Sequence, residues 1–162
     1  MSPARQLTII SGGQSGADRA ALDFAIEHGL AHDGWCPQER RAEDGPLDAR
    51  YQLRETTSKK YDQRTKWNVR DSDATLVFSI ARQTQGGTAL TIELAERAGR
   101  PCLHLAREDF AADDGIAQAA AKLREFLAQH EVTRLNVAGP RASQEPEVAA
   151  FVDRVLQAAL VT

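Results

Sequence analysis

The sequence predicts an α/β protein: a Rossmann-like, doubly wound domain with a mostly parallel sheet of about five strands. Two observations lead to this class. Short apolar, β-branched segments alternate with longer segments of helical periodicity, which is the pattern of repeated strand–helix–strand units. In addition, three loops rich in glycine and small polar residues each follow an expected strand and precede an expected helix. These loops are residues 11–18, 85–88 and 138–143.

The first half of the chain contains one clear strand–loop–helix unit. Residues 7–10 are a short apolar run ended by glycines, and a helix begins near Asp18 and stops at Gly29. The residues expected on the inner side of this helix are Ala21, Leu22, Ala25 and Ile26. The pattern breaks down between residues 33 and 60, where 35–37 indicates only a short strand end and 40–46 is a charged loop.

The second half alternates strands and helices more regularly. Residues 74–80 have the strongest strand signal, and 102–105 and 134–138 are further short strands. The expected helices are 61–71, one after Gly87 that ends at 99–101, 113–129 with Asp113 or Asp114 as N-cap, and 145–160 with Pro146 in its first turn. In the helix after Gly87, the expected inner residues are Ile92, Leu94, Ala95 and Ala98.

Length and composition indicate a single domain spanning residues 1–162, since 42% hydrophobic and 27% charged residues are ordinary globular values. The net charge of −3 gives no general attraction to nucleic acid or anionic membranes. No signal-peptide core begins the chain, and no apolar run approaches the roughly 20 residues of a membrane helix. We therefore expect a cytoplasmic protein without nucleic-acid or membrane partners. Cys36 and Cys102 are far apart and lack CxxC spacing, so no metal site and no disulfide are predicted.

The three loops have the composition of anion-binding sites. The carboxyl ends of parallel strands meet at one edge of a sheet, where helix N-termini present unpaired N–H groups and partial positive charge. The first loop is neither a Walker A sequence nor GxGxxG, because its glycines at 12, 13 and 16 are in a GGxxG arrangement. Ser15 adds a hydroxyl, and Asp18 can cap the helix or accept a hydrogen bond from a ligand. The sequence therefore predicts a binder of a phosphorylated small molecule.

Several motifs together resemble those of the molybdenum cofactor carrier proteins, the circularly permuted YpsA-like branch of the SLOG superfamily. They are SGGQSGADRAALD at 11–23, GWCP at 34–37, RAEDGP at 41–46, RTKWNVRDSDAT at 64–75, GGT at 86–88 and LNVAGPRAS at 135–143. The resemblance spans nearly the whole chain. It implies a Rossmann-like fold, a homo-oligomer, and binding of molybdenum cofactor or a nucleotide-like ligand, with molybdenum enzymes or cofactor-insertion proteins as candidate recipients.

The expected ligand carries a phosphate and a polar ring, so it needs both anion-binding groups and hydrogen bonds to ring edges. Backbone N–H groups of residues 12–16 and 86–88 are assigned to anionic oxygens, together with the Thr88 hydroxyl. Arg141 is expected to clamp phosphate or molybdate in a bidentate manner, with Ser143 beside it. The complete set of predicted binding residues is Gly12, Gly13, Gln14, Ser15, Gly16, Asp18, Gly86, Gly87, Thr88, Thr91, Gly139, Pro140, Arg141 and Ser143. No catalytic and no metal-ligating residue is predicted.

Other residues have two interpretations that the sequence leaves open. Arg41 and Asp44 belong either to a lid over the ligand or to a solvated turn with an internal ion pair. Trp35 and Trp67 either stack on a ligand ring or belong to the core or a subunit interface. Cys36 is more commonly a buried apolar residue than a molybdenum ligand. The residues Lys66, Asn68 and Arg70 alternate, so a helix brings at most one or two of them to a shared site.

The rival function is enzymatic. Related SLOG phosphoribohydrolases carry a GGxGTxxE loop whose acidic residue serves cleavage of the N-glycosidic bond. Here Thr91 stands at the acidic position, and Glu93 lies two residues further, turned by about 200° on a helix. No Ser/His/Asp or Cys/His set is evident. Binding without chemistry is therefore favoured over hydrolysis, and a nucleotide-responsive sensor is a further alternative.

Overall fold

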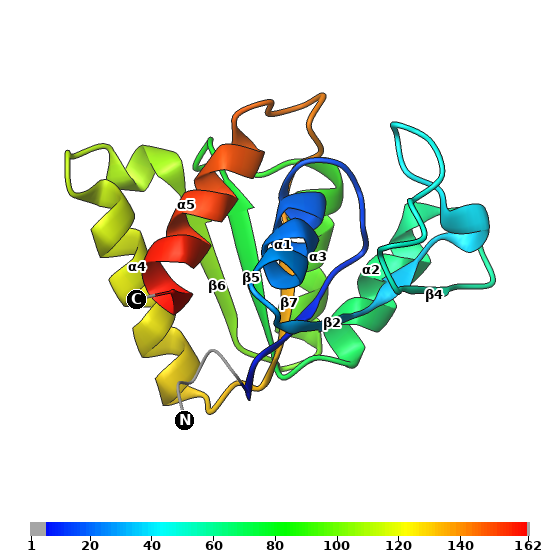
Figure 1. Cartoon of the computed structure of the whole chain (residues 1–162), viewed down its shortest axis with the longest axis horizontal. Coiled ribbons are helices and arrows are strands. Elements are labelled where there is room, and N and C mark those ends of the chain that lie inside the picture. Colours follow the sequence, from blue (N-terminus) through cyan, green and yellow to red (C-terminus); the bar gives the residue numbers. More distant parts are fainter. Residues whose placement is uncertain (1–5, 162) are drawn as a thin grey trace.

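A five-stranded parallel sheet forms the centre of the structure, a computed structural model that describes residues 6–161 (Figure 1). The strand order is β2-β1-β7-β5-β6, and every neighbouring pair is parallel. The strands are β1 (Thr8–Ile10), β2 (Ala31–Asp33), β5 (Ala74–Ser79), β6 (Cys102–Ala106) and β7 (Arg134–Ala138). All six residues of β5 are buried, as expected for an inner strand covered on both faces. The predicted parallel sheet and α/β class are confirmed.

Helices cover both faces of this sheet. On one face α1 (Ala17–Glu27) and α4 (Gly115–Gln129) both pack against α5 (Val148–Leu160). On the other face α2 (Tyr61–Arg70) packs against α3 (Gly86–Arg97) (Figure 1). Helix α1 connects β1 to β2, and α3 connects β5 to β6, and these two connections run in opposite directions along the sheet. Because crossovers between parallel strands are right-handed, opposite directions place the two helices on opposite faces. The loops that lead into α1 and α3 thus diverge around β7.

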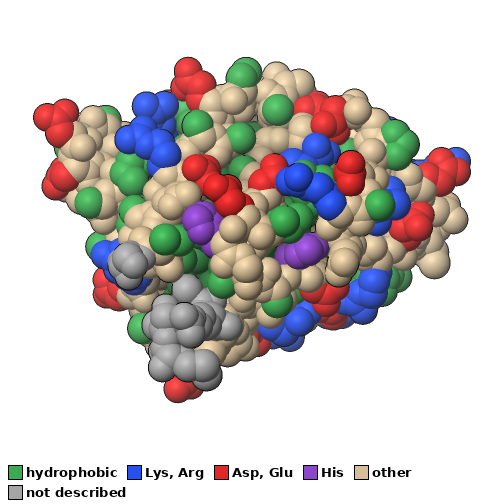
Figure 2. Space-filling model, in the orientation of Figure 1, with side chains coloured by type: hydrophobic (Ala, Val, Ile, Leu, Met, Phe, Trp, Pro, Cys, Tyr) green, Lys and Arg blue, Asp and Glu red, His purple; other side chains and the backbone are tan. Residues whose placement is uncertain are grey.

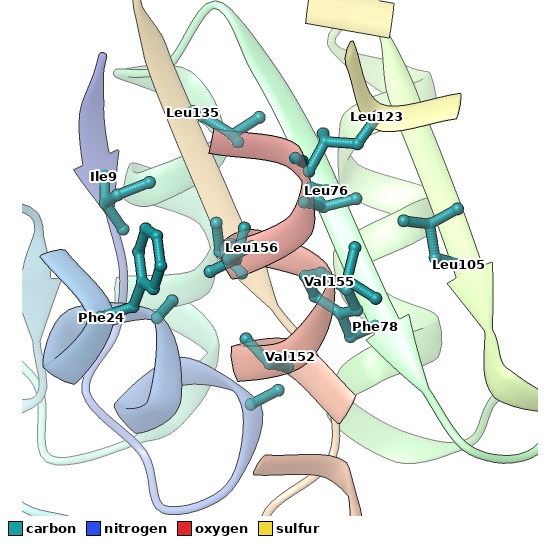
Figure 3. Packing of buried hydrophobic residues seen from close by; sticks show 14 of the residues in the cluster. Ile9, Phe24, Leu76, Phe78, Leu105, Leu123, Leu135, Val152, Val155 and Leu156 are labelled. Carbon is teal, nitrogen blue, oxygen red and sulfur yellow. The ribbon is translucent and has the colours of Figure 1, made fainter. Parts of the chain in front are cut away.

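The main core lies between the sheet and the helices α1, α4 and α5. Figure 3 shows Val152, Val155 and Leu156 of α5 beside Leu76 and Phe78 of β5, all in one buried cluster. In α5 these residues recur at helical spacing on one face, which explains why this segment forms an amphipathic helix. The core therefore includes side chains of β1, β5 and β7, the strands whose ends carry the three loops.

A second, smaller cluster attaches residues 34–60 to α1. This segment contains β3 (Trp35–Cys36), the short 3₁₀ helix Gln38–Arg40 and β4 (Arg54–Glu55), and it extends from the β2 side of the sheet (Figure 1). Strands β3 and β4 pair in a separate two-stranded sheet. The buried members of the cluster are Leu22, Cys36, Ala42, Leu47, Tyr51 and Leu53. The segment without clear periodicity is therefore folded, and it is held by apolar contacts to α1. A second 3₁₀ helix, Arg107–Phe110, follows β6.

Several local predictions were wrong. The fifth strand of the main sheet is Ala31–Asp33, whereas the expected strand end at 35–37 belongs to the small sheet. Ile26 is 36% exposed, and Phe24 takes the inward position in α1. The last helix begins at Val148, so Pro146 precedes it instead of lying in its first turn. Ala98 is exposed at the end of α3.

Charge is distributed without a dominant sign on the face that Figure 2 draws, where acidic and basic side chains alternate. None of the helices within residues 6–161 has the length and apolar character needed to cross a membrane.

Candidate functional site

Three loops lie along one edge of the sheet, at the top of Figure 1: the first after β1, the second after β5 and the third after β7. The first and third loops are in direct contact. Ala17 donates its backbone N–H to the Pro140 carbonyl oxygen at 3.2 Å. Gly16 has φ of 84°, and a Cβ there would lie 2.4 Å from that same oxygen, so only glycine fits. The structure thus brings the predicted loops together.

The first loop is covered by protein. Residues 11–18 are all buried, and several of their polar groups have internal partners. The N–H of Gly13 donates to Ser11 Oγ at 3.2 Å, and the N–H of Ser15 donates to Gln14 Oε1 at 3.0 Å. A Cβ on Gly13 would lie 2.6 Å from a Leu47 methyl carbon, which shows how closely residues 41–47 pack on the loop. Arg64 covers Gly12 and the third loop covers Gly16 in the same way, so the first loop is not open to a ligand in this structure.

A buried ion pair stands at the start of α1. Arg64 Nη1 of α2 lies 3.5 Å from Asp18 Oδ2, and the two side chains are 11% and 3% exposed. Burial raises the pKa of Asp18 above its ordinary value, and the nearby Arg64 guanidinium and the N–H groups of Gln14 and Gly139 oppose that rise. Asp18 therefore ties the first and third loops to α2, with its carboxylate directed into the protein.

Glu43 places a carboxylate between the first and third loops. It accepts hydrogen bonds from the Ser15 hydroxyl, from the Ser143 hydroxyl at 2.5 Å and from the Ser143 N–H at 3.1 Å. These hydrogen bonds, Ser143 first, lower the pKa of Glu43. Its neighbour Asp44 forms a bidentate pair with Arg19, both distances being 2.9 Å. The charged loop is thus fastened over the site, and a protein carboxylate occupies donors expected to meet a ligand anion.

The second loop differs from the first because it is open. Helix α3 begins at Gly86, so the N–H groups of residues 86–88 lie in the first turn, where no acceptor exists within the helix. A Cβ built on Gly86 or Gly87 would meet nothing within 4 Å. A cleft of about 310 Å³ lies beside this turn, between the second and third loops. It is lined by Ser79, Ala81, Gln83, Thr84, Gln85, Thr88, Pro140, Gln144 and Glu145.

The two threonines of α3 have different positions. Thr88 lines the cleft. The Thr91 hydroxyl is buried and donates to the Gly87 carbonyl oxygen at 2.9 Å, so it is engaged within the helix. Glu93 points outward and pairs with Arg97 at 2.6 Å. Among the residues of α3, none places a carboxylate in the cleft.

The third loop contributes Arg141 and a carboxylate that the sequence did not single out. The Arg141 guanidinium carbon lies 5.2 Å from the centre of the Tyr61 ring. Glu145 accepts hydrogen bonds from the N–H groups of Ile80 at 2.8 Å and Ala81 at 3.0 Å. Both Glu145 oxygens are therefore engaged in joining the third loop to the end of β5.

The tryptophans and most polar residues of α2 have structural contacts. Trp35 and Trp67 pack edge to face, with ring centres 4.7 Å apart. Asn68 is buried and exchanges hydrogen bonds with the Trp35 backbone at 2.8 and 3.0 Å. Lys66 is exposed, and Arg70 pairs with Asp71. Arg64 is the member of this helix that reaches the first loop.

Neither Cys36 nor Cys102 forms a disulfide. Cys36 is fully buried, and burial raises the pKa of its thiol. Burial also raises the pKa of Cys102, to about 11. Within residues 6–161, no group of three or more His, Cys, Asp or Glu side chains is arranged to hold a metal ion.

A serine–histidine contact that the sequence did not suggest lies beside the cleft. Ser79 Oγ is 2.6 Å from His104 Nε2, and it also donates to the Ala81 carbonyl oxygen at 2.6 Å. A hydroxyl has a single proton, so the bond to Ala81 requires His104 to be the donor in the other contact. Burial lowers the pKa of His104. This arrangement directs the Ser79 proton away from the imidazole, which is the reverse of a nucleophile–base pair.

The structure adds four residues to the candidate site that the sequence did not indicate: Arg64, Glu43, Tyr61 and Glu145. Arg64 and Glu43 lie within the motifs RTKWNV and RAEDGP, so the motifs were a signal, but neither residue was assigned a role. Together, the parallel sheet, the open helix N-terminus and the loop-borne arginine define a Rossmann-like α/β protein whose candidate ligand site lies at the carboxyl edge of the sheet.

Comparison with known proteins identifies the family. Residues 9–160 match the model of the circularly permutated YpsA SLOG family, and the chain belongs to that family. It is similar to a crystal structure named "putative molybdenum carrier protein" from Syntrophus aciditrophicus SB, with 42% sequence identity and a TM-score of 0.93. The match covers 99% of this chain and 98% of that one. A search of curated proteins found no match. The resemblance stated from the motifs is confirmed.

Proposed function

We propose that this protein binds molybdenum cofactor, a phosphorylated pterin, and acts as its carrier or store. The observation that carries the proposal is the open first turn of α3 beside the cleft of about 310 Å³. N–H groups at a helix N-terminus favour anionic oxygens, and a cleft of this size accommodates a small heterocycle. The name of the similar crystal structure supports the same ligand class.

The residues divide the task in the proposed complex. The N–H groups of Gly86, Gly87 and Thr88, with the Thr88 hydroxyl, would hold anionic oxygens. Residues from the opposite wall, such as Gln144, offer hydrogen-bonding groups to a polar ring edge. Arg141 adds a positive charge from the third loop. No residue of this set needs to change its protonation state, which suits binding without chemistry.

Native mass spectrometry tests the ligand directly. The protein, purified anaerobically from its own kind of cell, is expected to carry a molybdenum–pterin mass on each subunit. The same spectrum would report the number of subunits in the expected homo-oligomer. A nucleotide mass would instead favour the alternative, a nucleotide sensor or a phosphoribohydrolase-like enzyme. Release of free base from a nucleoside monophosphate would favour the enzyme.

A pair of substitutions at Gly87 tests the place of binding. Gly87→Pro removes one N–H in the first turn of α3, where proline is tolerated, whereas Gly87→Ala retains it. Hydrogen bonds to charged groups contribute about 1.5–3 kcal/mol, so Gly87→Pro should weaken cofactor binding roughly tenfold to a hundredfold. Gly87→Ala should bind nearly as the unchanged protein does. Equal affinity of both variants would remove α3 from the site.

A further inference from the structure

Three arginine side chains from separate segments lie close to one tyrosine ring. The guanidinium carbons of Arg41, Arg64 and Arg141 lie 4.8, 5.5 and 5.2 Å from the centre of the Tyr61 ring. They come from the charged loop, from α2 and from the third loop, respectively. These distances to one ring centre limit the separation of any two of the guanidinium carbons to 10.7 Å at most. Contacts with the ring alone do not account for gathering three like charges.

The acidic side chains nearby leave this cluster with an excess of positive charge. Asp18 pairs with Arg64 from the buried side. The hydrogen bonds of Glu43 with Ser143 and Ser15 are the main cause of its lowered pKa, and the charge of Arg141 is a smaller one. Within residues 6–161, neither Arg41 nor Arg141 has a carboxylate oxygen within 4.0 Å. Arg41 donates to the Lys59 carbonyl oxygen at 3.1 Å, which orients it without neutralising it.

Two buried donors of the same region also lack partners. Arg64 Nε and Gln14 Nε2 are inaccessible to solvent and make no hydrogen bond within the described part of the chain. Gln14 is 4% exposed, and its amide oxygen accepts from the N–H of Glu43 at 2.8 Å, so it lies directly under the charged loop. Buried polar groups nearly always have a partner in native proteins. The protein itself therefore leaves part of the hydrogen-bonding capacity of Arg64, one of the clustered arginines, unused.

We propose that Arg41, Arg64 and Arg141, arranged around Tyr61, form a subsite for a tetrahedral dianion. Guanidinium groups match the oxygens of phosphate in bidentate geometry, and Arg41 and Arg141, which form no ion pair within residues 6–161, would face the two charges of a dianion. The inference extends the proposed function, since it assigns the ligand's phosphate or its metal oxyanion to this cluster, apart from the first turn of α3. It also names Arg64 and Tyr61 as binding residues in addition to the loops.

Calorimetric titration with inorganic phosphate, and separately with molybdate, tests the subsite at pH 8 and constant ionic strength. The double variant Arg41→Gln/Arg141→Gln should bind both dianions at least about tenfold more weakly than the unchanged protein. Arg50→Gln/Arg70→Gln is the matched control, because it removes the same charge from exposed arginines that pair with Asp23 and Asp71. Arg64 is left unchanged, because its removal would leave the buried carboxylate of Asp18 without its ion-pair partner. Thermal melts in chloride verify that both variants fold.

The outcomes separate this proposal from the proposed function. Tighter binding of phosphate would assign the cluster to a phosphate monoester, and tighter binding of molybdate would assign it to a metal oxyanion. Equal dianion affinity of the cluster variant and the control variant would overturn the subsite, as would a protein that binds neither dianion. If the cluster variant retained full affinity for the cofactor, the subsite would fail while the carrier function stood. If the protein bound dianions through the cluster but bound no pterin, the subsite would stand and the carrier function would fail.

Discussion

Replacement of Arg64 by methionine provides the sharpest test of how the site is held together. The substitution keeps a long side chain but removes the charge that faces buried Asp18 at 3.5 Å. At that distance, two unit charges attract by about 5 kcal/mol for an effective dielectric constant of about 20. Loss of one partner of a buried pair typically costs about 3–5 kcal/mol, because it leaves an uncompensated charge. Arg64→Met should therefore lower the free energy of unfolding by that amount at pH 7.5.

The same variant has a pH dependence of definite sign. Burial already raises the folded-state pKa of Asp18 above 3.8, and loss of Arg64, which opposes that effect, raises it further. A carboxyl group whose folded pKa is raised contributes stability below its unfolded pKa, and this contribution is lost as the pH rises through its folded pKa. The variant should thus be less impaired at pH 5 than at pH 7.5. Urea unfolding at both pH values measures this difference, and Asp18→Asn/Arg64→Met should recover part of the loss.

Two results would contradict this account of the Asp18–Arg64 pair. The first is a loss of less than about 1 kcal/mol at pH 7.5, which is the value for an exposed pair. The second is an equal loss at both pH values, which would mean that Asp18 does not carry the unpaired charge.

Three further predictions concern single positions. Glu43→Gln removes a negative charge that competes with ligand anions, so phosphate affinity measured by calorimetry should rise about threefold to tenfold; unchanged or weaker binding would contradict this role. Gly34 has φ of 139°, and a Cβ there would lie 2.2 Å from the Ser11 carbonyl oxygen. Gly34→Ala should therefore lower the free energy of unfolding, measured with urea, by at least about 2 kcal/mol. A decrease below about 0.5 kcal/mol would be inconsistent with the close contact. Burial raises the pKa of Cys102 to about 11, so iodoacetamide at pH 8 should modify it about a hundredfold more slowly than an unstructured cysteine peptide; equal rates would show that this side chain is accessible as a thiolate.

The sequence predicted the elements whose apolar residues follow a clear pattern, and it failed for a strand that exists only because it pairs with a neighbouring strand. The apolar run of β5 is buried along its whole length, so its residues indicate a strand by themselves. Strand β2 has the sequence Ala-His-Asp and is only partly buried at the edge of the sheet, so no local pattern marks it. It is a strand because β1 supplies hydrogen-bonding partners on one side.

Prediction of the candidate site was limited in the same way. Glycine and small polar residues after strands predicted the three loops, and α3 begins within the second one. The sequence did not suggest that Glu43 bonds to Ser143, which is 100 residues away, or that Arg64 packs over Gly12. Such contacts join side chains from separate segments, and local spacing carries no information about them.

Local patterns in the chain therefore suffice to indicate the α/β class, the parallel sheet and the positions of three glycine-rich loops, because backbone geometry links these features to short-range spacing. No local pattern indicates that the first loop is covered, that the N-terminus of α3 is open, or that three arginines lie close to one tyrosine ring. These properties depend on how residues 34–60, α2 and the third loop pack against one another. Packing is a property of all the elements at once, so it becomes visible only when the chain is folded.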